Sequence, residues 1–223
     1  MDDRALLRRY VLGLPLLSLL PACTKQTYYE ATEGRAPRSL LLKALRAFEQ
    51  EQSRLKLAID AGHGNGIETI AMLRHGLEVH AHDVSESATE RLLQRVPAHL
   101  RSQLHAETAP FELAHWPAGA DLVFAGYSLP FASPAKFHAA WKLMTESLRD
   151  GGRFAGQLFG SEDTWAEGPE AIGGTFMSRE QTLALLEQRF EVEYFSEERE
   201  DGETALGEEK FWHVFHIIAK KRG

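Results

Sequence analysis

The feature that most constrains the fold of this chain is a glycine-rich turn between an apolar run and a helical segment. The run Leu55–Asp60 has the length of one buried strand, and Gly62, Gly64 and Gly66 follow it closely. Residues 67–74 then show a helical pattern. Glycine permits a tight turn and lets a ligand approach the backbone. This order predicts an α/β sheet that binds a ligand at the carboxyl end of its first strand.

The rest of the chain continues the alternation of strands and helices. Further strands are predicted over residues 77–83, 105–108, 121–126 and 153–159, with helices over 39–50, 86–96, 134–148 and 179–188. The last two predicted strands, 190–196 and 211–219, have no helix between them and should pair as an antiparallel hairpin at one edge. The acidic stretch Glu197–Glu209 is predicted to be a solvated loop. The elements predict a three-layer, Rossmann-like α/β sandwich with a seven-stranded, mostly parallel sheet.

Length and composition fit one ordinary globular domain. The chain has 223 residues, of which 43% are hydrophobic. It carries 25 Lys and Arg against 32 Asp and Glu, and the net charge of −7 disfavours a nucleic-acid partner. Its single cysteine, Cys23, excludes an intrachain disulfide and a cysteine-based zinc site. We expect a monomer or a dimer.

Two aspartates beside the glycine turn indicate the kind of ligand. Asp83 ends the second predicted strand, where its carboxylate can accept two hydrogen bonds from a ribose diol. Asp60 precedes Gly62 by two residues, within reach of a cationic amine. A dinucleotide turn would have glycine at the position of Ile67, and this turn has no Lys or Arg for a phosphate. S-adenosylmethionine, which has an amine and a ribose diol but no phosphate, therefore fits better than a nicotinamide dinucleotide.

The residues around this turn resemble the class I S-adenosylmethionine-dependent methyltransferases. Leu57–Gly66 is similar to the first motif of that family, Val79–Asp83 to its second-strand motif, and 148–154 to the loop and strand after its fifth helix. Tyr28–Thr32 and Gly126–Phe131 look like segments of small stand-alone bacterial enzymes of the tellurite-resistance type. The resemblance extends from about residue 28 to about residue 220.

The resemblance also implies roles for individual residues. The residues implied to contact the cofactor are Asp60, Gly62, His63, Gly64, Asn65, Gly66, Asp83, Val84, Ala109 and Tyr127. Others would surround a small-molecule methyl acceptor that the sequence does not identify. These acceptor-site candidates are Tyr28, Tyr29, Ser128, Gln157 and Phe159. The cofactor carries the activated methyl group, so the reaction needs neither a metal nor a catalytic triad.

The histidines predict no metal site. His80 and His82 are two residues apart on a predicted strand, a spacing that suits a metal pair. They have no carboxylate partner at the fixed sequence spacing of a known metal motif. His213 and His216 fall on opposite faces of the last strand and so do not form a pair.

Residues 1–27 read as a separate segment ahead of a methyltransferase domain at 28–223. Arg8 and Arg9 precede an apolar stretch, and Cys23 follows it, as in a bacterial lipoprotein signal. The segment can equally be an uncleaved extension. Because S-adenosylmethionine is made in the cytosol, we expect a cytoplasmic enzyme. The alternative is a membrane-anchored lipoprotein processed at Cys23.

Two further functions stay open at this point. A nicotinamide-dependent oxidoreductase would use a similar sheet, although Ile67 disfavours it. A non-catalytic lipoprotein with a cofactor-type fold would explain the signal-like N-terminus. The presence of Asp60, Asp83 and all three glycines favours a working cofactor site.

Overall fold

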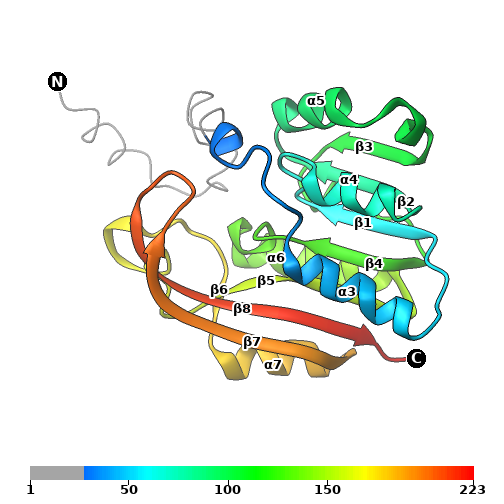
Figure 1. Ribbon diagram of the computed structural model, residues 1–223. Helices are drawn as coiled ribbons and strands as arrows, with labels where there is room; N and C mark the ends of the chain where they lie inside the picture. Colours follow the sequence, from blue (N-terminus) through cyan, green and yellow to red (C-terminus); the bar gives the residue numbers. More distant parts are fainter. Residues whose placement is uncertain (1–27) are drawn as a thin grey trace.

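The computed structural model describes residues 28–223, so the segment 1–27 and the predictions made for Cys23 lie outside it. The helices are α3 (Ser39–Gln50), α4 (Ile67–Arg74), α5 (Glu86–Arg95), α6 (Pro134–Ser147) and α7 (Arg179–Glu187), with short 3-10 turns η3 (Ala98–Gln103), η4 (Leu129–Phe131) and η5 (Gly168–Glu170) (Figure 1). The strands are β1 (Leu57–Ala61), β2 (Glu78–Asp83), β3 (Leu104–Thr108), β4 (Ala120–Ala125), β5 (Leu148–Gly160), β6 (Phe176–Met177), β7 (Phe190–Glu203) and β8 (Glu209–Lys221).

The strands form one sheet in the order β3-β2-β1-β4-β5-β8-β7, and β6 pairs with β5 off this path. Strands β1 to β5 run parallel to their neighbours, whereas β8 is antiparallel to both β5 and β7. The predicted α/β architecture, with a mostly parallel sheet and an antiparallel edge hairpin, is confirmed. The two-residue strand β6 adds an eighth strand to the seven predicted.

The prediction of a solvated loop over Glu197–Glu209 was wrong. Strand β7 continues to Glu203 and β8 begins at Glu209, so residues 204–208 alone connect them. The acidic side chains have cross-strand partners that favour the extended hairpin. Glu197 accepts from His213 at 3.0 Å and Glu198 from His216 at 2.8 Å.

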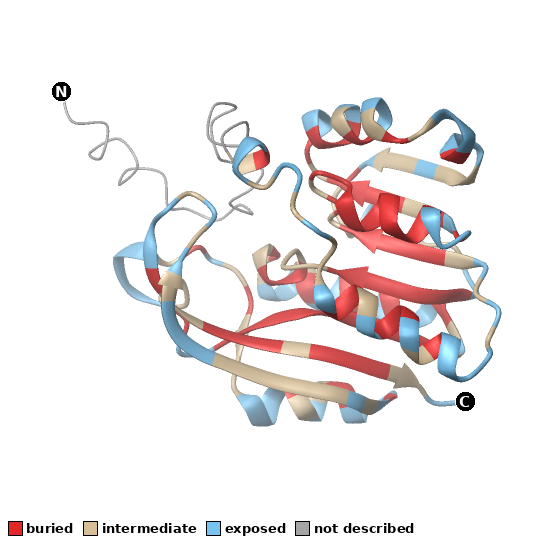
Figure 2. Ribbon diagram, in the orientation of Figure 1, coloured by how far each residue is buried: buried red, intermediate tan, exposed pale blue. Residues whose placement is uncertain are grey.

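Helices cover both faces of the sheet (Figure 1). Helices α3, α4 and α5 pack on one face, whose core includes Ala58 of β1 and Val79 of β2. Helices α6 and α7 pack on the other face, whose core includes Ile59 and Val123. Adjacent residues of a strand therefore enter opposite cores, as the pleat requires. The central strands are buried along most of their length, while β3 and the hairpin are more exposed (Figure 2).

The connection from β3 to β4, residues 109–119, contains no helix. Among residues 28–223, no helix therefore covers β2 and β3 on the face where α6 and α7 lie. Residues 78, 80 and 82 of β2 lie on this face, because Val79 and Ala81 enter the opposite core. Within 28–223, every helix is too short or too polar to cross a membrane.

Candidate functional site

The order of the strands reverses between β1 and β4. From β1 the chain moves outward through β2 to β3, and it then returns to the other side of β1 as β4. In open α/β sheets, such a reversal leaves a ligand-binding crevice outside the carboxyl ends of the two strands. The glycine turn 62–66 follows β1 at this place, and the segment 126–131 follows β4.

The turn after β1 has a backbone conformation that glycine adopts most readily. Gly62, Gly64 and Gly66 have φ angles of 81°, 49° and 70°. The amide of Gly62 donates to the carbonyl oxygen of His82 at 2.8 Å, which joins the turn to the end of β2. A Cβ at Gly64 would have no atom of the described residues 28–223 within 4 Å, its chain neighbours aside. Gly64 therefore presents bare backbone to open space, where a ligand can approach.

Gly62 is also required for close packing. A Cβ there would lie 2.4 Å from Cβ of Ser128. Gly76 has the same φ of 81°, but a Cβ added at Gly76 would meet no atom of the described residues within 4 Å. We expect Gly76→Ala to cost about 1–2 kcal/mol of unfolding free energy from backbone strain alone. Gly62→Ala should cost clearly more, because the backbone after β4 must also move. Urea unfolding of both variants measures the difference, and equal losses would contradict the packing role.

Asp83 lies at the end of β2 and is bonded to the glycine turn. Its Oδ2 accepts from the Gly64 amide at 2.9 Å, and its Oδ1 accepts from the Ser85 amide at 2.9 Å. Each carboxylate oxygen has two acceptor sites, so both oxygens can still accept from a ligand. The Ala109 amide donates to the Asp83 carbonyl at 2.9 Å, which brings Ala109 beside Val84 and Asp83. The structure thus places three predicted cofactor residues together.

Asp60 is a buried carboxyl at the end of β1. Its Oδ2 accepts from the Thr69 hydroxyl at 2.5 Å. Burial raises its pKa to about 7, with the charges of Glu68 and Asp83 acting in the same direction against the Thr69 hydrogen bond. The carboxyl is therefore poised to pair with a cation.

His63 and Asn65, both in the turn and predicted as cofactor contacts, have hydrogen-bond partners within the protein. His63 is buried, and its Nδ1 lies 3.0 Å from the Gly64 carbonyl oxygen. The amide of Asn65 donates at 2.7 Å to the carbonyl oxygen of Tyr29 and at 2.7 Å to the hydroxyl of Thr32. Asn65 thus fastens the N-terminal lid, residues 28–33, to the turn.

A clamp on the segment that follows this lid was not found by sequence reasoning. Glu68, in the first turn of α4, accepts two hydrogen bonds from the Arg35 guanidinium at 2.6 and 2.7 Å. It also accepts from the backbone amide of Arg38 at 3.0 Å. An acidic residue in the first helical turn after a glycine loop is a signal that could have pointed to Glu68. Its partners, 30 or more residues away, could not be found in that way.

Two of the predicted acceptor residues, Gln157 and Phe159, lie near Tyr127, which was predicted as a cofactor contact. Tyr127 has a positive φ of 55°, uncommon for a non-glycine residue, and the Arg38 guanidinium lies 4.6 Å from its ring centre. The rings of Tyr127 and Phe159 are 6.2 Å apart. Gln157 is buried, and its Nε2 lies 3.4 Å from Nδ1 of His216.

Three other acceptor candidates are held by protein contacts. The Ser128 hydroxyl donates to the Ala61 carbonyl oxygen and so links the segment after β4 to β1. Burial raises the pKa of Tyr29 to about 12, with the Asp83 charge adding to it. Burial also raises the pKa of Tyr28, opposed by Arg38 and Arg35. The two rings lie edge to face with their centres 5.8 Å apart, so both tyrosines are in the same part of the site, and the Asp83 charge acts on both.

Comparison with known proteins places this site in a family. Residues 58–152 match the model of the methyltransferase domain, a range that includes the glycine turn, Asp83 and Tyr127. No curated protein sequence matches the chain.

Solved structures show the same fold over most of the chain. TehB from Haemophilus influenzae is 14% identical with a TM-score of 0.67, over 89% of this chain and 67% of that one. The 1,6-didemethyltoxoflavin-N1-methyltransferase of Burkholderia thailandensis is 19% identical with a TM-score of 0.63, over 96% and 93%. NodS, an N-methyltransferase of Bradyrhizobium japonicum, is 14% identical with a TM-score of 0.62, over 90% and 99%. The class I methyltransferase fold expected from the sequence is confirmed.

Proposed function

We propose that this chain transfers a methyl group from S-adenosylmethionine to a small molecule. The observation that carries the proposal is Asp83, whose two oxygens are held by the amides of Gly64 and Ser85 at the strand reversal. S-adenosylmethionine is the cofactor, as the sequence predicted, and the NodS and Burkholderia structures were solved with S-adenosylhomocysteine. The comparisons give no support to the nicotinamide-dependent oxidoreductase or to the non-catalytic lipoprotein.

The residues at the crevice fit the parts of that cofactor. Asp83 accepts hydrogen bonds from the ribose hydroxyls, and Val84 and Ala109 flank the adenine. Asp60 pairs with the amine of the methionine part, beside the bare backbone at Gly64. When bound, the cofactor supplies a sulfonium methyl that is already activated. The chain therefore has to bind and orient the cofactor and the acceptor, and it has to exclude water from them.

The charge of the site suits a cationic cofactor. Asp60, Glu68 and Asp83 are all buried near the turn. Arg35 pairs with Glu68 in a bidentate contact, which leaves Asp60 and Asp83 to face a ligand. An amine and a sulfonium therefore enter a site of opposite charge.

We expect cofactor affinity to depend on pH through Asp60. With its pKa at about 7, Asp60 is protonated in the empty site at lower pH. Binding an amine requires the ionised form, so S-adenosylhomocysteine affinity should fall below pH 7 by up to about tenfold per pH unit. It should level off above pH 7. Calorimetry from pH 5.5 to 8 measures how the affinity changes with pH. The Asp60→Asn variant should bind S-adenosylhomocysteine more weakly, with an affinity that no longer depends on pH in this range. A wild-type slope retained in Asp60→Asn would assign the titration to another group.

Aromatic and polar side chains of the segment after β4, of β5 and of β8 support a small acceptor. The ring of Phe159 lies 6.2 Å from Tyr127, 5.7 Å from Phe131 and 6.3 Å from Trp212. His216 has Glu198 at 2.8 Å from its Nε2, so the imidazole can take a proton from a hydroxyl acceptor. The Burkholderia neighbour was solved with bound 1,6-didemethyltoxoflavin, also a small molecule.

Transfer of a labelled methyl group tests the proposed acceptor class. The full chain is incubated with methyl-labelled S-adenosylmethionine and with separate small-molecule, protein and nucleic-acid fractions of a bacterial extract. We expect label in the small-molecule fraction with the wild type and none with Asp83→Ala. Label in protein or nucleic acid alone would contradict the proposed acceptor.

The supply of the methyl donor supports a cytoplasmic enzyme with an uncleaved N-terminal segment. We therefore expect the N-terminal peptide of the native protein to be unlipidated, with Cys23 as a free thiol. Mass spectrometry of that peptide measures this directly. A diacylated peptide that begins at Cys23 would overturn the proposed location and leave the fold and cofactor site as they are.

A further inference from the structure

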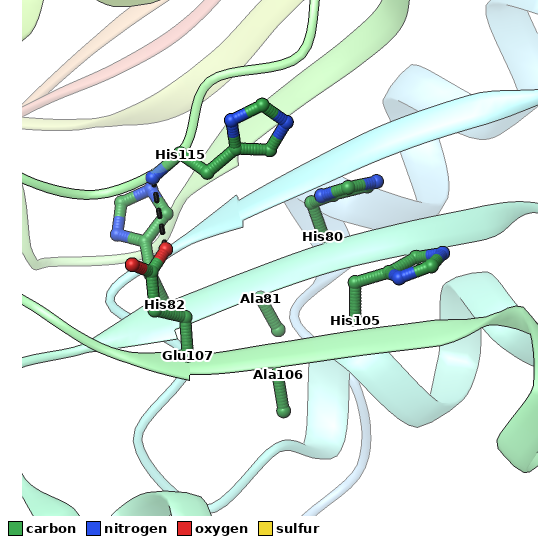
Figure 3. A pocket seen from close by; sticks show the side chains of 7 residues that line it. All are labelled: His80, Ala81, His82, His105, Ala106, Glu107 and His115. Carbon is green, nitrogen blue, oxygen red and sulfur yellow. Dashed lines mark hydrogen bonds between the residues drawn. The ribbon is translucent and has the colours of Figure 1, made fainter.

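A pocket on the helix-free part of the sheet is lined by imidazoles from three segments of the chain. His80 and His82 come from β2, His105 from β3 and His115 from the connection 109–119. Figure 3 shows the rings of His80, His105 and His115 on one side of the two strands, with Ala81 and Ala106 pointing to the other side. The pocket lies at mid-strand, so the methyl-transfer site does not use it.

Three atoms of metal-ligand type converge beside this pocket, two of them from histidines that line it. Oε1 of Glu78 lies 2.9 Å from Nε2 of His105 and 3.7 Å from Nε2 of His80. All three ligand atoms lie within 4.8 Å of one another. Ligand atoms in a tetrahedral zinc site are about 3.3 Å apart, given zinc–nitrogen distances of about 2.0–2.1 Å. The observed separations bracket that value.

The sheet itself holds these ligands in place. His80 and His105 are register partners on adjacent parallel strands, and their rings stack at 4.3 Å. The His115 ring lies 5.5 Å from that of His80, and its backbone amide donates to Glu107 at 2.8 Å (Figure 3). The sheet therefore already brings Glu78, His80 and His105 together, whereas the His115 ring would have to turn toward them to bind the same ion.

His82 gives an independent sign that the pocket receives a polar ligand. Its side chain lines the same pocket and is 2% exposed. Among residues 28–223, neither of its ring nitrogens has a hydrogen-bond partner. Its ring packs edge-on against Trp116 at 4.7 Å and Phe111 at 5.7 Å. Buried polar atoms without partners are uncommon, and a water held in the pocket would supply the missing partner.

We propose that Glu78, His80 and His105 bind one divalent cation of the zinc type, with His115 as the fourth ligand. Two or three imidazoles with one carboxylate select zinc and similar transition metals over magnesium or calcium, which prefer oxygen ligands. The ion would fasten β3, an edge strand whose only strand partner within 28–223 is β2. The simpler alternative is a hydrogen-bonded Glu–His network without metal.

Calorimetry of the full chain with zinc chloride tests the proposal. We expect one high-affinity ion per chain, and His105→Gln should weaken its binding about tenfold or more. His75→Gln is the matched control, because His75 has a single carboxylate neighbour, Glu49 at 4.0 Å, and lies outside the pocket. It should leave the affinity unchanged. Equal zinc binding by His105→Gln and the wild type would overturn the site.

Thermal unfolding gives a second readout that does not involve methyl transfer. Zinc should raise the melting temperature of the wild type, magnesium should not, and the zinc effect should be lost in Glu78→Gln. Glu78 is largely exposed, so this variant is expected to fold even if a histidine variant does not. A wild-type melting temperature that zinc leaves unchanged would support the hydrogen-bonded network and overturn the proposal.

Discussion

Asp83→Ala is expected to weaken S-adenosylhomocysteine binding by about 2–4 kcal/mol, that is roughly 30-fold to 1,000-fold. The variant loses two charge-assisted hydrogen bonds to the ribose. It also releases the amides of Gly64 and Ser85, which the carboxylate holds at 2.9 Å. The turn is then less organised before the cofactor arrives. Calorimetry on the full chain measures the change.

Two further variants separate the ribose contact from general electrostatics. Asp83→Asn keeps one carbonyl oxygen as acceptor but no charge, so its affinity should lie between those of the wild type and the alanine variant. Glu86→Ala removes an exposed carboxylate three residues away and should leave binding nearly unchanged. An Asp83→Ala protein that folds and binds normally would place the ribose elsewhere.

Asp163→Ala is expected to cost about 3–5 kcal/mol of unfolding free energy, because it leaves a buried ammonium unpaired. Lys210 Nζ lies 2.5 Å from Oδ1 of Asp163, and both side chains are almost wholly buried, at 1% and 0% exposure. The ammonium also lies 3.5 Å from the ring centre of Trp165 and 3.8 Å from that of Trp212. These rings alone are a weaker partner than a carboxylate. Urea unfolding measures the loss.

The double variant Asp163→Ala/Lys210→Met is the control for the buried ion pair. It removes both charges, and methionine fills much of the lysine volume. Its loss of unfolding free energy should therefore be smaller than the sum of the losses of the two single variants. Strictly additive losses, or a loss below about 1 kcal/mol for Asp163→Ala, would show that the pair is not coupled.

The glycine turn and its two aspartates could be predicted because each is a local signal. A strand followed by Gly62, Gly64 and Gly66 specifies a turn, and Asp83 ends the next strand. The order of strands and helices then follows from the alternation of patterns. These local features were sufficient for the class of fold and the cofactor.

Contacts between distant residues could not be predicted from such signals. The clamp of Glu68 on Arg35 joins residues 33 positions apart. The cluster of Glu78, His80 and His105 depends on the register of β2 against β3, and the sequence predicts neither that register nor the missing helix at 109–119. The acidic hairpin was misjudged for the same reason, since its glutamates have histidine partners on the neighbouring strand.

Calorimetric titration of the full chain with S-adenosylhomocysteine and, separately, with NAD tests the central claim most directly. We predict that one S-adenosylhomocysteine binds per chain, that Asp83→Ala loses most of this affinity, and that NAD gives no binding heat. Tight NAD binding without binding of S-adenosylmethionine or S-adenosylhomocysteine would contradict the account.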